Sequence, residues 1–137
     1  MITELRLPPS EIIREEPTPD DLLLVVRGGR HSLSNANLER ATADTWERYG
    51  FFGISVFGAP GDDLMALSSE VGAIRRRSEV RLARVGGLRA ARYEVVPTFT
   101  NRAHFSVVLG EASVGAFALL RSCFSAPRPN PGYEPDR

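Results

Sequence analysis

Short runs of apolar residues recur along the 137-residue chain and predict its β-strands. A continuous apolar run with β-branched residues is typical of a buried strand, whereas alternation predicts one exposed face. The predicted strands span 21–26, 51–57, 79–85, 93–99 and 104–109, with a further short edge strand at 2–7. Prolines at 8, 9, 17 and 19 then prevent regular structure between the edge strand and the next one.

Apolar residues at helical spacing predict helices between these strands. The helices are expected at 35–49, at 64–77 and at 111–124, with a single helical turn at 88–92 after a turn at Gly86–Gly87. Ser34 or Asn35 suits the cap of the first helix and Gly50 suits its end. Asp62 or Asp63 suits the cap of the second helix.

This order of elements predicts an α+β fold in a single compact domain, with about five strands and about three helices. Early strands separated by helices favour parallel pairs, whereas 93–99 and 104–109 suit an antiparallel arrangement. The sheet is therefore predicted to be mixed and partly antiparallel. The domain spans 22–124, between an acidic Pro-rich arm at 1–21 and a Pro-rich C-terminal tail at 125–137 without secondary structure.

The composition is that of an ordinary globular protein, 42% hydrophobic and 25% charged. Cys123 is the sole cysteine, which excludes an internal disulfide and a cysteine zinc site, and a buried inert thiol is its simplest role. The acidic start lacks the order of a signal peptide, and Glu111 interrupts the longest apolar stretch, 105–120. We expect a cytoplasmic protein without a membrane segment or a metal site.

All 17 basic residues are arginine, a bias that GC-rich genomes favour and that suits phosphate or carboxylate binding. Residues 1–21 hold six acids and two arginines, net −4, and residues 71–102 hold eight arginines and two glutamates, net +6. The basic middle suits a phosphate-rich ligand or an acidic partner, or else it pairs with the chain's own arm. The sequence leaves both interpretations open.

The turn RGGRHS at 27–32 follows a predicted strand and precedes a predicted helix. Gly28 and Gly29 allow a concave nest of backbone N–H groups, and Arg27, Arg30 and His31 add positive or titratable groups. This combination suits a phosphate or pyrophosphate, although it is neither a G-x-G-x-x-G nor a Walker A loop. The alternative is a tight turn with exposed arginines.

Two further polar residues lie on predicted strands. Ser55 is a lone hydroxyl in an apolar strand, where it is either a core serine bonded to backbone or part of a cleft. His104 opens a strand, and the strand period puts Ser106 on its face. His104 suits a general acid or base, and an edge histidine without a role is the alternative. The paired His-x-Ser/Thr motifs of two-histidine phosphoesterases are incomplete, because HSLS at 31–34 does not fit.

The order Arg27, Ser55 and Glu94 resembles that of ADP-ribosyltransferases, in which an arginine and a serine hold NAD and a glutamate activates the acceptor or the ribose. The resemblance implies NAD as a ligand of Arg27 and Ser55, with Glu94 as a catalytic residue. It covers single residues, because the chain has neither the S-T-S triplet nor the E-x-E pair of that family.

A first hypothesis is that of a small cytosolic bacterial protein, a toxin-like enzyme of a toxin–antitoxin or defence operon that acts on a phosphorylated ligand, NAD or RNA. Arg27 and Arg30 bind phosphate and Ser55 orients the ligand. His104 or Glu94 moves a proton or stabilises charge, as in a transferase or a ribonuclease. The hypothesis requires the RGGRHS turn to face the same cleft as Ser55 or His104.

A second hypothesis is that of a noncatalytic interaction module or accessory subunit. The uneven charge and the Pro-rich ends are natural docking segments for a small, acidic, neighbour-encoded partner or for a homo-oligomer. Nucleic acid binding through residues 75–92 is a variant of this hypothesis. Tyr93 is then the one nearby aromatic residue available for base stacking.

Overall fold

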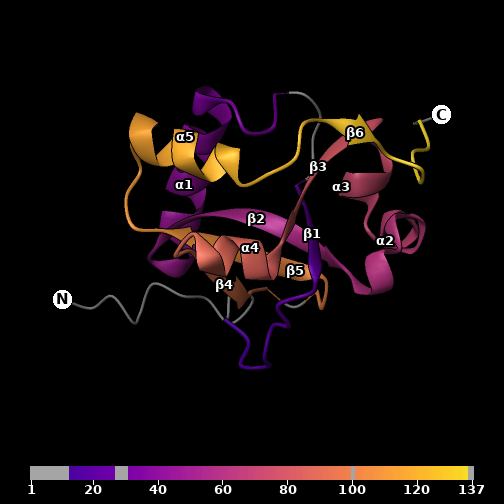
Figure 1. The fold of residues 1–137 in the computed structure, drawn as a ribbon, viewed down its shortest axis with the longest axis horizontal. Helices are drawn as coiled ribbons and strands as arrows, with labels where there is room; N and C mark the ends of the chain where they lie inside the picture. The colour runs from indigo at the N-terminus through magenta and orange to yellow at the C-terminus, as the bar shows by residue number, and fades with distance from the viewer. Residues whose placement is uncertain (1–12, 27–30, 100, 136–137) are drawn as a thin grey trace.

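The computed structural model describes residues 13–26, 31–99 and 101–135 (Figure 1). These residues form one sheet with helices packed on it, which confirms the α+β class in a single domain. The strand expected at 2–7 lies outside the described residues. Among the helices of the described ranges, none has the length and apolar character that crossing a membrane requires.

The sheet is antiparallel throughout its described strands. These are β1 (Leu23–Val26), β2 (Phe52–Ala59), β3 (Glu79–Arg84), β4 (Glu94–Pro97), β5 (His104–Leu109) and β6 (Arg128–Pro129), in the order β4-β5-β2-β1-β3-β6. The parallel pairs expected among the early strands are therefore wrong. Val25 pairs with Phe57, and β2 starts at Phe52, beyond the carboxyl end of β1. The chain thus enters β2 from that end and runs back along β1.

The helices begin and end largely where the sequence predicts them. They are α1 (Asn35–Tyr49), α2 (Leu64–Glu70), α3 (Gly72–Arg75), α4 (Val85–Ala90) and α5 (Val114–Ser122), with a 3-10 turn, η3, at Pro60–Asp62. The Ser34 hydroxyl accepts a hydrogen bond of 3.2 Å from the Asn37 amide and caps α1. Gly50 ends α1 with a left-handed φ of 80°, which a residue without Cβ adopts at no steric cost.

Some local predictions are wrong. The second predicted helix breaks at Val71, whose extended backbone, with φ −115° and ψ 102°, separates α2 from α3. Gly86 and Gly87 lie inside α4 rather than in a turn, because Val85 and Leu88 bury their side chains and hold the segment against the sheet. The tail, expected without secondary structure, contains β6, which pairs with β3.

Helices cover the two faces of the sheet unequally (Figure 1). On the first face, α1, α4 and α5 pack around central strand residues such as Leu24, Val56 and Val107. On the second face, α2 and α3 pack around Val25 and Phe57. Within the described residues, no member of this second core comes from β4 or β5. At that end, the second face carries Ser55, His104 and Ser106 beside Val96 and Val108.

Part of the basic middle pairs with nearby acids and with the arm. Arg84 donates two hydrogen bonds of 2.7 Å to the Asp62 carboxylate and one of 2.9 Å to the carbonyl of Asp21. Arg89 forms an ion pair of 2.5 Å with Asp20. Arg89 therefore pairs with an acid of the arm, as one of the two interpretations expects, whereas the ion pair of Arg84 is with Asp62, outside the arm.

Replacing Asp62 by asparagine is expected to weaken the dependence of the free energy of unfolding on pH in the acid range. Hydrogen bonds from Arg84 lower the pKa of Asp62 in the folded protein. A lowered pKa stabilises the fold above the unfolded-state value of about 3.9, and this contribution is lost as the pH falls through the folded pKa. Urea unfolding of both proteins between neutral and strongly acid pH measures the effect.

At neutral pH the wild type should be the more stable protein by a small margin, because the pair is exposed and solvent-screened. Asparagine suits position 62, where φ is 60°, since it tolerates the left-handed backbone as aspartate does. This difference in stability between the wild type and Asp62→Asn should vanish once the pH falls below the pKa of Asp62 in the folded protein. A margin that persists unchanged in strong acid would show that the carboxylate charge is not its source.

Candidate functional site

The predicted catalytic residues Ser55, Glu94 and His104 lie on one face of three neighbouring strands. In β2 and β4, Ser55 and Val96 each pair with Ser106 of β5. Directly opposed residues of antiparallel strands share a face, and so do residues two apart along one strand. Ser55, Glu94 and His104 therefore share the second face, at the end beyond the core under α2 and α3.

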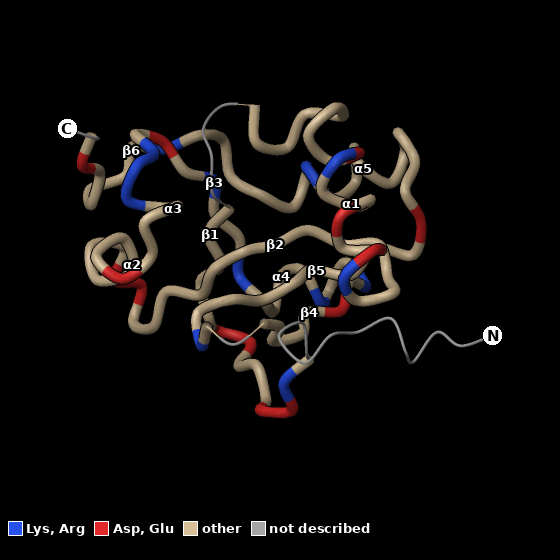
Figure 2. The backbone as a smooth tube through the Cα atoms, turned by 180° about the vertical axis from the view of Figure 1, so that it is seen from behind, with Lys and Arg blue, Asp and Glu red and all other residues tan. Residues whose placement is uncertain are grey.

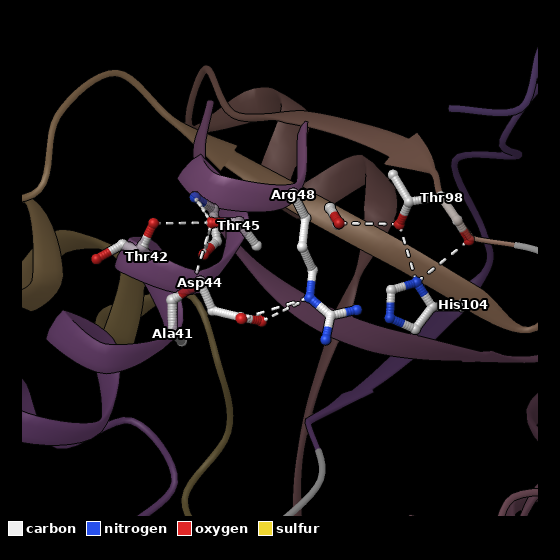
Figure 3. A network of polar contacts seen from close by, with 9 residues as sticks. Ala41, Thr42, Asp44, Thr45, Arg48, Thr98 and His104 are labelled. Atoms are coloured by element: carbon white, nitrogen blue, oxygen red, sulfur yellow. Dashed lines mark hydrogen bonds and ion pairs between the residues drawn. The ribbon is translucent and has the colours of Figure 1, made fainter. Parts of the chain in front are cut away.

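A network of hydroxyl groups holds the His104 ring (Figure 3). Its Nδ1 lies 2.9 Å from the Thr98 hydroxyl and 3.2 Å from the Thr98 carbonyl, and the Thr98 hydroxyl lies 2.9 Å from that of Ser106. Because a carbonyl only accepts, we assign the proton to Nδ1, which makes Nε2 the basic nitrogen of the neutral ring. Thr98 and Ser106 are fully buried, so groups inside the protein fix this tautomer.

Two aromatic rings set the plane of the imidazole. Phe57 and Phe99 make edge contacts with His104, with ring centroids 5.4 and 5.7 Å apart. Phe99 has a φ of 64°, which is rare for a bulky residue, and strained backbone of this kind gathers at functional sites. Sequence reasoning missed Thr98 and Phe99, because only the register of β4 against β5 brings them to His104.

Arg14, in the N-terminal arm, supports the backbone from which His104 projects. Its guanidinium hydrogen-bonds the carbonyls of Asn101, Arg102 and His104, the last two at 3.2 and 3.0 Å. The guanidinium also lies over the Phe105 ring, 5.5 Å from the centroid. The described part of the arm therefore fixes the start of β5 rather than hanging loose from the domain.

Ser55 lies closer to His104 than Glu94 does. Ser55 is half-buried and pairs with Ser106, so it is a diagonal neighbour of His104, about 7–8 Å away between backbones. Glu94 pairs with Val108, four residues along β5 from His104, which is about 13 Å along the strand. The structure thus brings Ser55 to His104 and leaves Glu94, which is exposed, at the far end of the face.

The predicted anion-binding turn falls largely outside the described residues, which include His31 but not Arg27, Gly28, Gly29 or Arg30. His31 is exposed, and its carbonyl accepts a hydrogen bond of 3.0 Å from the Ser34 amide at the start of α1. Leu33, two residues on, belongs to the core of the first face, and its carbonyl accepts from Arg121 of α5. His31 therefore lies at the start of α1, and the shared cleft of the turn with Ser55 or His104 stays a prediction.

The remaining candidates for a ligand are few. In the described ranges, no group of three or more histidine, cysteine, aspartate or glutamate side chains gathers in a way that could hold a metal ion. Cys123 is half-buried, and its thiol lies 3.5 Å from the Leu119 carbonyl.

No family model matches the chain, and searches of curated proteins and of solved structures give no significant match.

Proposed function

We propose that the chain is an enzyme acting on a phosphorylated ligand, with RNA as its substrate and His104 as its general base. The observation that carries the proposal is the contact of Nδ1 with the hydroxyl and carbonyl of Thr98, which orients Nε2 as the basic nitrogen. Histidine is the side chain that most often serves as a general base. Thr98 acts through the imidazole and is a positioning residue.

RNA suits this arrangement better than NAD does. The arrangement that resembles ADP-ribosyltransferases needs Ser55 and Glu94 beside one ligand, and β5 lies between their strands, β2 and β4. Cleavage of RNA needs no enzyme nucleophile, because the 2′-hydroxyl of the substrate attacks its own phosphorus. A basic nitrogen and a hydrogen-bond donor to the phosphate are then the minimum that the protein supplies.

The proposed step exchanges one bond and transfers one proton at each end of the exchange. His104 Nε2 accepts the proton of the 2′-hydroxyl as that oxygen bonds to phosphorus. The bond from phosphorus to the 5′-oxygen breaks, this oxygen takes a proton from water, and the hydroxide so formed takes back the proton from the His104 imidazolium. The products are a 2′,3′-cyclic phosphate and a 5′-hydroxyl. Ser55, the diagonal neighbour of His104, donates a hydrogen bond to the phosphate.

His104→Ala is expected to slow cleavage of a single-stranded RNA oligonucleotide by about a hundredfold, the usual contribution of a general base. Ser55→Ala should slow it by about tenfold, as the loss of one hydrogen bond to a charged group does. Gel analysis should identify cyclic phosphate ends, and expression of the wild type alone should arrest growth, as for a toxin.

Glu39→Gln, an exposed change on α1 at the first face, is the matched control and should cleave like the wild type. A purified wild-type protein that yields no product refutes the proposal. Equal cleavage by the wild type and His104→Ala refutes it too, because the activity then comes from elsewhere.

The outer face of α5 supports a second candidate, the noncatalytic module. Its exposed residues are all uncharged: Val114, Gly115, Ala118, Leu119 and Ser122. Val114 and Leu119 are 65% and 66% exposed, so they present apolar surface to the solvent on this face. An uncharged face on a chain of zero net charge meets its own copy without like-charge repulsion. A second copy of this chain is therefore the proposed occupant.

The oligomeric state of purified protein, measured by light scattering across a hundredfold range of concentration, tests this second candidate. The wild type should dimerise and Leu119→Glu should stay monomeric, because a charge then enters the apolar contact. Met65→Glu on α2, where Met65 is 61% exposed, is the control and should dimerise like the wild type. A monomeric wild type at every concentration rules this candidate out.

A further inference from the structure

The C-terminal tail lies along α3 and the residues that follow it. The side-chain amide of Asn130 donates hydrogen bonds of 3.0 Å to the carbonyls of Ile74 and Arg77. Further on, the amide of Glu134 donates one of 2.9 Å to the carbonyl of Arg75. Tyr133, which is 42% exposed, is thereby held beside the run of arginines at 75–77.

Arginines from two segments gather here: Arg75 at the end of α3 with Arg76 and Arg77 after it, and Arg128 of β6. Figure 2 shows basic segments beside α3, β3 and β6. The strand pair β3–β6 sets Arg128 opposite Val80. Against these four arginines stands Glu134, a local net charge of +3. We call Arg75, Arg77, Arg128 and Tyr133 the tail surface.

The guanidinium group of Arg75 is held by carbonyls rather than by an acid. Arg75 donates to the carbonyls of Ser68 and Ser69 at 3.3 and 3.0 Å. A neutral carbonyl positions the cation without cancelling its charge, unlike the carboxylates that pair with Arg84 and Arg89. Arg75 therefore supplies preorganised positive charge at the tail surface.

We propose that the tail surface binds single-stranded nucleic acid. Binding of this class combines cations that follow the phosphates with an aromatic ring on which a base stacks. The tail surface supplies both, in Arg77 and Arg128, which are exposed, and in Tyr133. The stacking ring comes from the tail, 56 residues beyond Arg77, rather than from Tyr93 within the basic run.

The tail surface is separate from the His104 site. His104 lies on β5, and β2 and β1 stand between that strand and β3 in the sheet. Binding at the tail surface therefore does not depend on cleavage at His104, and single-stranded DNA, which lacks the 2′-hydroxyl, tests binding alone.

Fluorescence anisotropy with a labelled oligothymidine measures the proposal. Tyr133→Ala is expected to weaken binding by about tenfold, whereas Tyr133→Phe keeps the ring and should bind like the wild type. The double variant Arg77→Ala with Arg128→Ala should lower the slope of log affinity against log salt by about 1.4, since each phosphate contact on a single strand contributes about 0.7. Arg40→Ala, an exposed arginine of α1, is the control and should leave the slope unchanged.

Urea unfolding of each variant confirms that the fold persists, which the exposure of these side chains predicts. Equal affinity of the wild type and Tyr133→Ala overturns the proposal, because no base then stacks on the ring. Displacement of the oligonucleotide by polyglutamate at equal charge concentration also overturns it, because the surface then selects acidic protein. An absence of binding at low salt has the same consequence.

Discussion

Asn130→Ala is expected to lower the free energy of unfolding by about 3 kcal/mol, although the residue lies in a Pro-rich tail outside the predicted domain. Asn130 is 6% exposed and is hydrogen-bonded through both ends of its amide. Its nitrogen donates to the carbonyls of Ile74 and Arg77, and its oxygen accepts from the Ser68 hydroxyl and the Gly132 amide. Alanine leaves these groups without that partner, which costs more than the hydrogen bonds contribute while formed.

Urea unfolding followed by circular dichroism gives the free energy, and an unchanged m-value would show that the loss arises in the folded state. Arg128→Ala, two residues earlier in the tail and exposed, is the matched control and should change stability by less than about 0.5 kcal/mol. If Asn130→Ala were equally harmless, the hydrogen bonds of the Asn130 side chain would contribute nothing to the stability of the fold. If it is destabilising, oligothymidine binding should weaken with it, since Asn130 positions Tyr133.

The contrast between Asn130 and the central strands shows what the sequence predicts and where it falls short. Runs such as FFGISVF identify strands because burial on both faces selects apolar side chains at every position. Asn130 sits among prolines, where composition indicates a loose tail. Its burial depends on hydrogen bonds to the carbonyls of Ile74 and Arg77, at the end of α3 and just after it, and no local pattern encodes that meeting.

The sequence predicts the candidate site, too, only in part. The shared face of His104 and Ser106 follows from the two-residue period of a strand, and it was predicted. The distance from His104 to Glu94 depends on strand register, which a single sequence does not contain. Thr98 reaches His104 because β4 and β5 are neighbours in the sheet, so this positioning residue becomes visible only in the structure. The role of Arg27 stays a prediction, since that residue lies outside the described part.

Thr45→Val is expected to lower the free energy of unfolding by about 2–4 kcal/mol, because it removes one hydroxyl that serves two buried peptide groups. The Thr45 hydroxyl accepts a hydrogen bond of 2.8 Å from the Gly53 amide and lies 2.8 Å from the Gly53 carbonyl (Figure 3). Gly53 lies near the start of β2, beyond the described end of β1. The Thr45 side chain therefore makes the hydrogen bonds that a neighbouring strand would otherwise make with Gly53.

Valine has almost the shape of threonine, so the change isolates the hydroxyl from the contacts of the side chain with its neighbours. Thr45→Ser keeps the hydroxyl and should lose less than about 1 kcal/mol, and the same urea titration measures both variants. A larger residue at position 53 could not compensate for the lost hydroxyl, because a Cβ there would lie 2.6 Å from the Val107 carbonyl oxygen. Equal stability of the valine variant and the wild type would mean that water satisfies Gly53. The packing of α1 on β2 would then rest on apolar contacts alone, such as the stacking of Trp46 on Phe52.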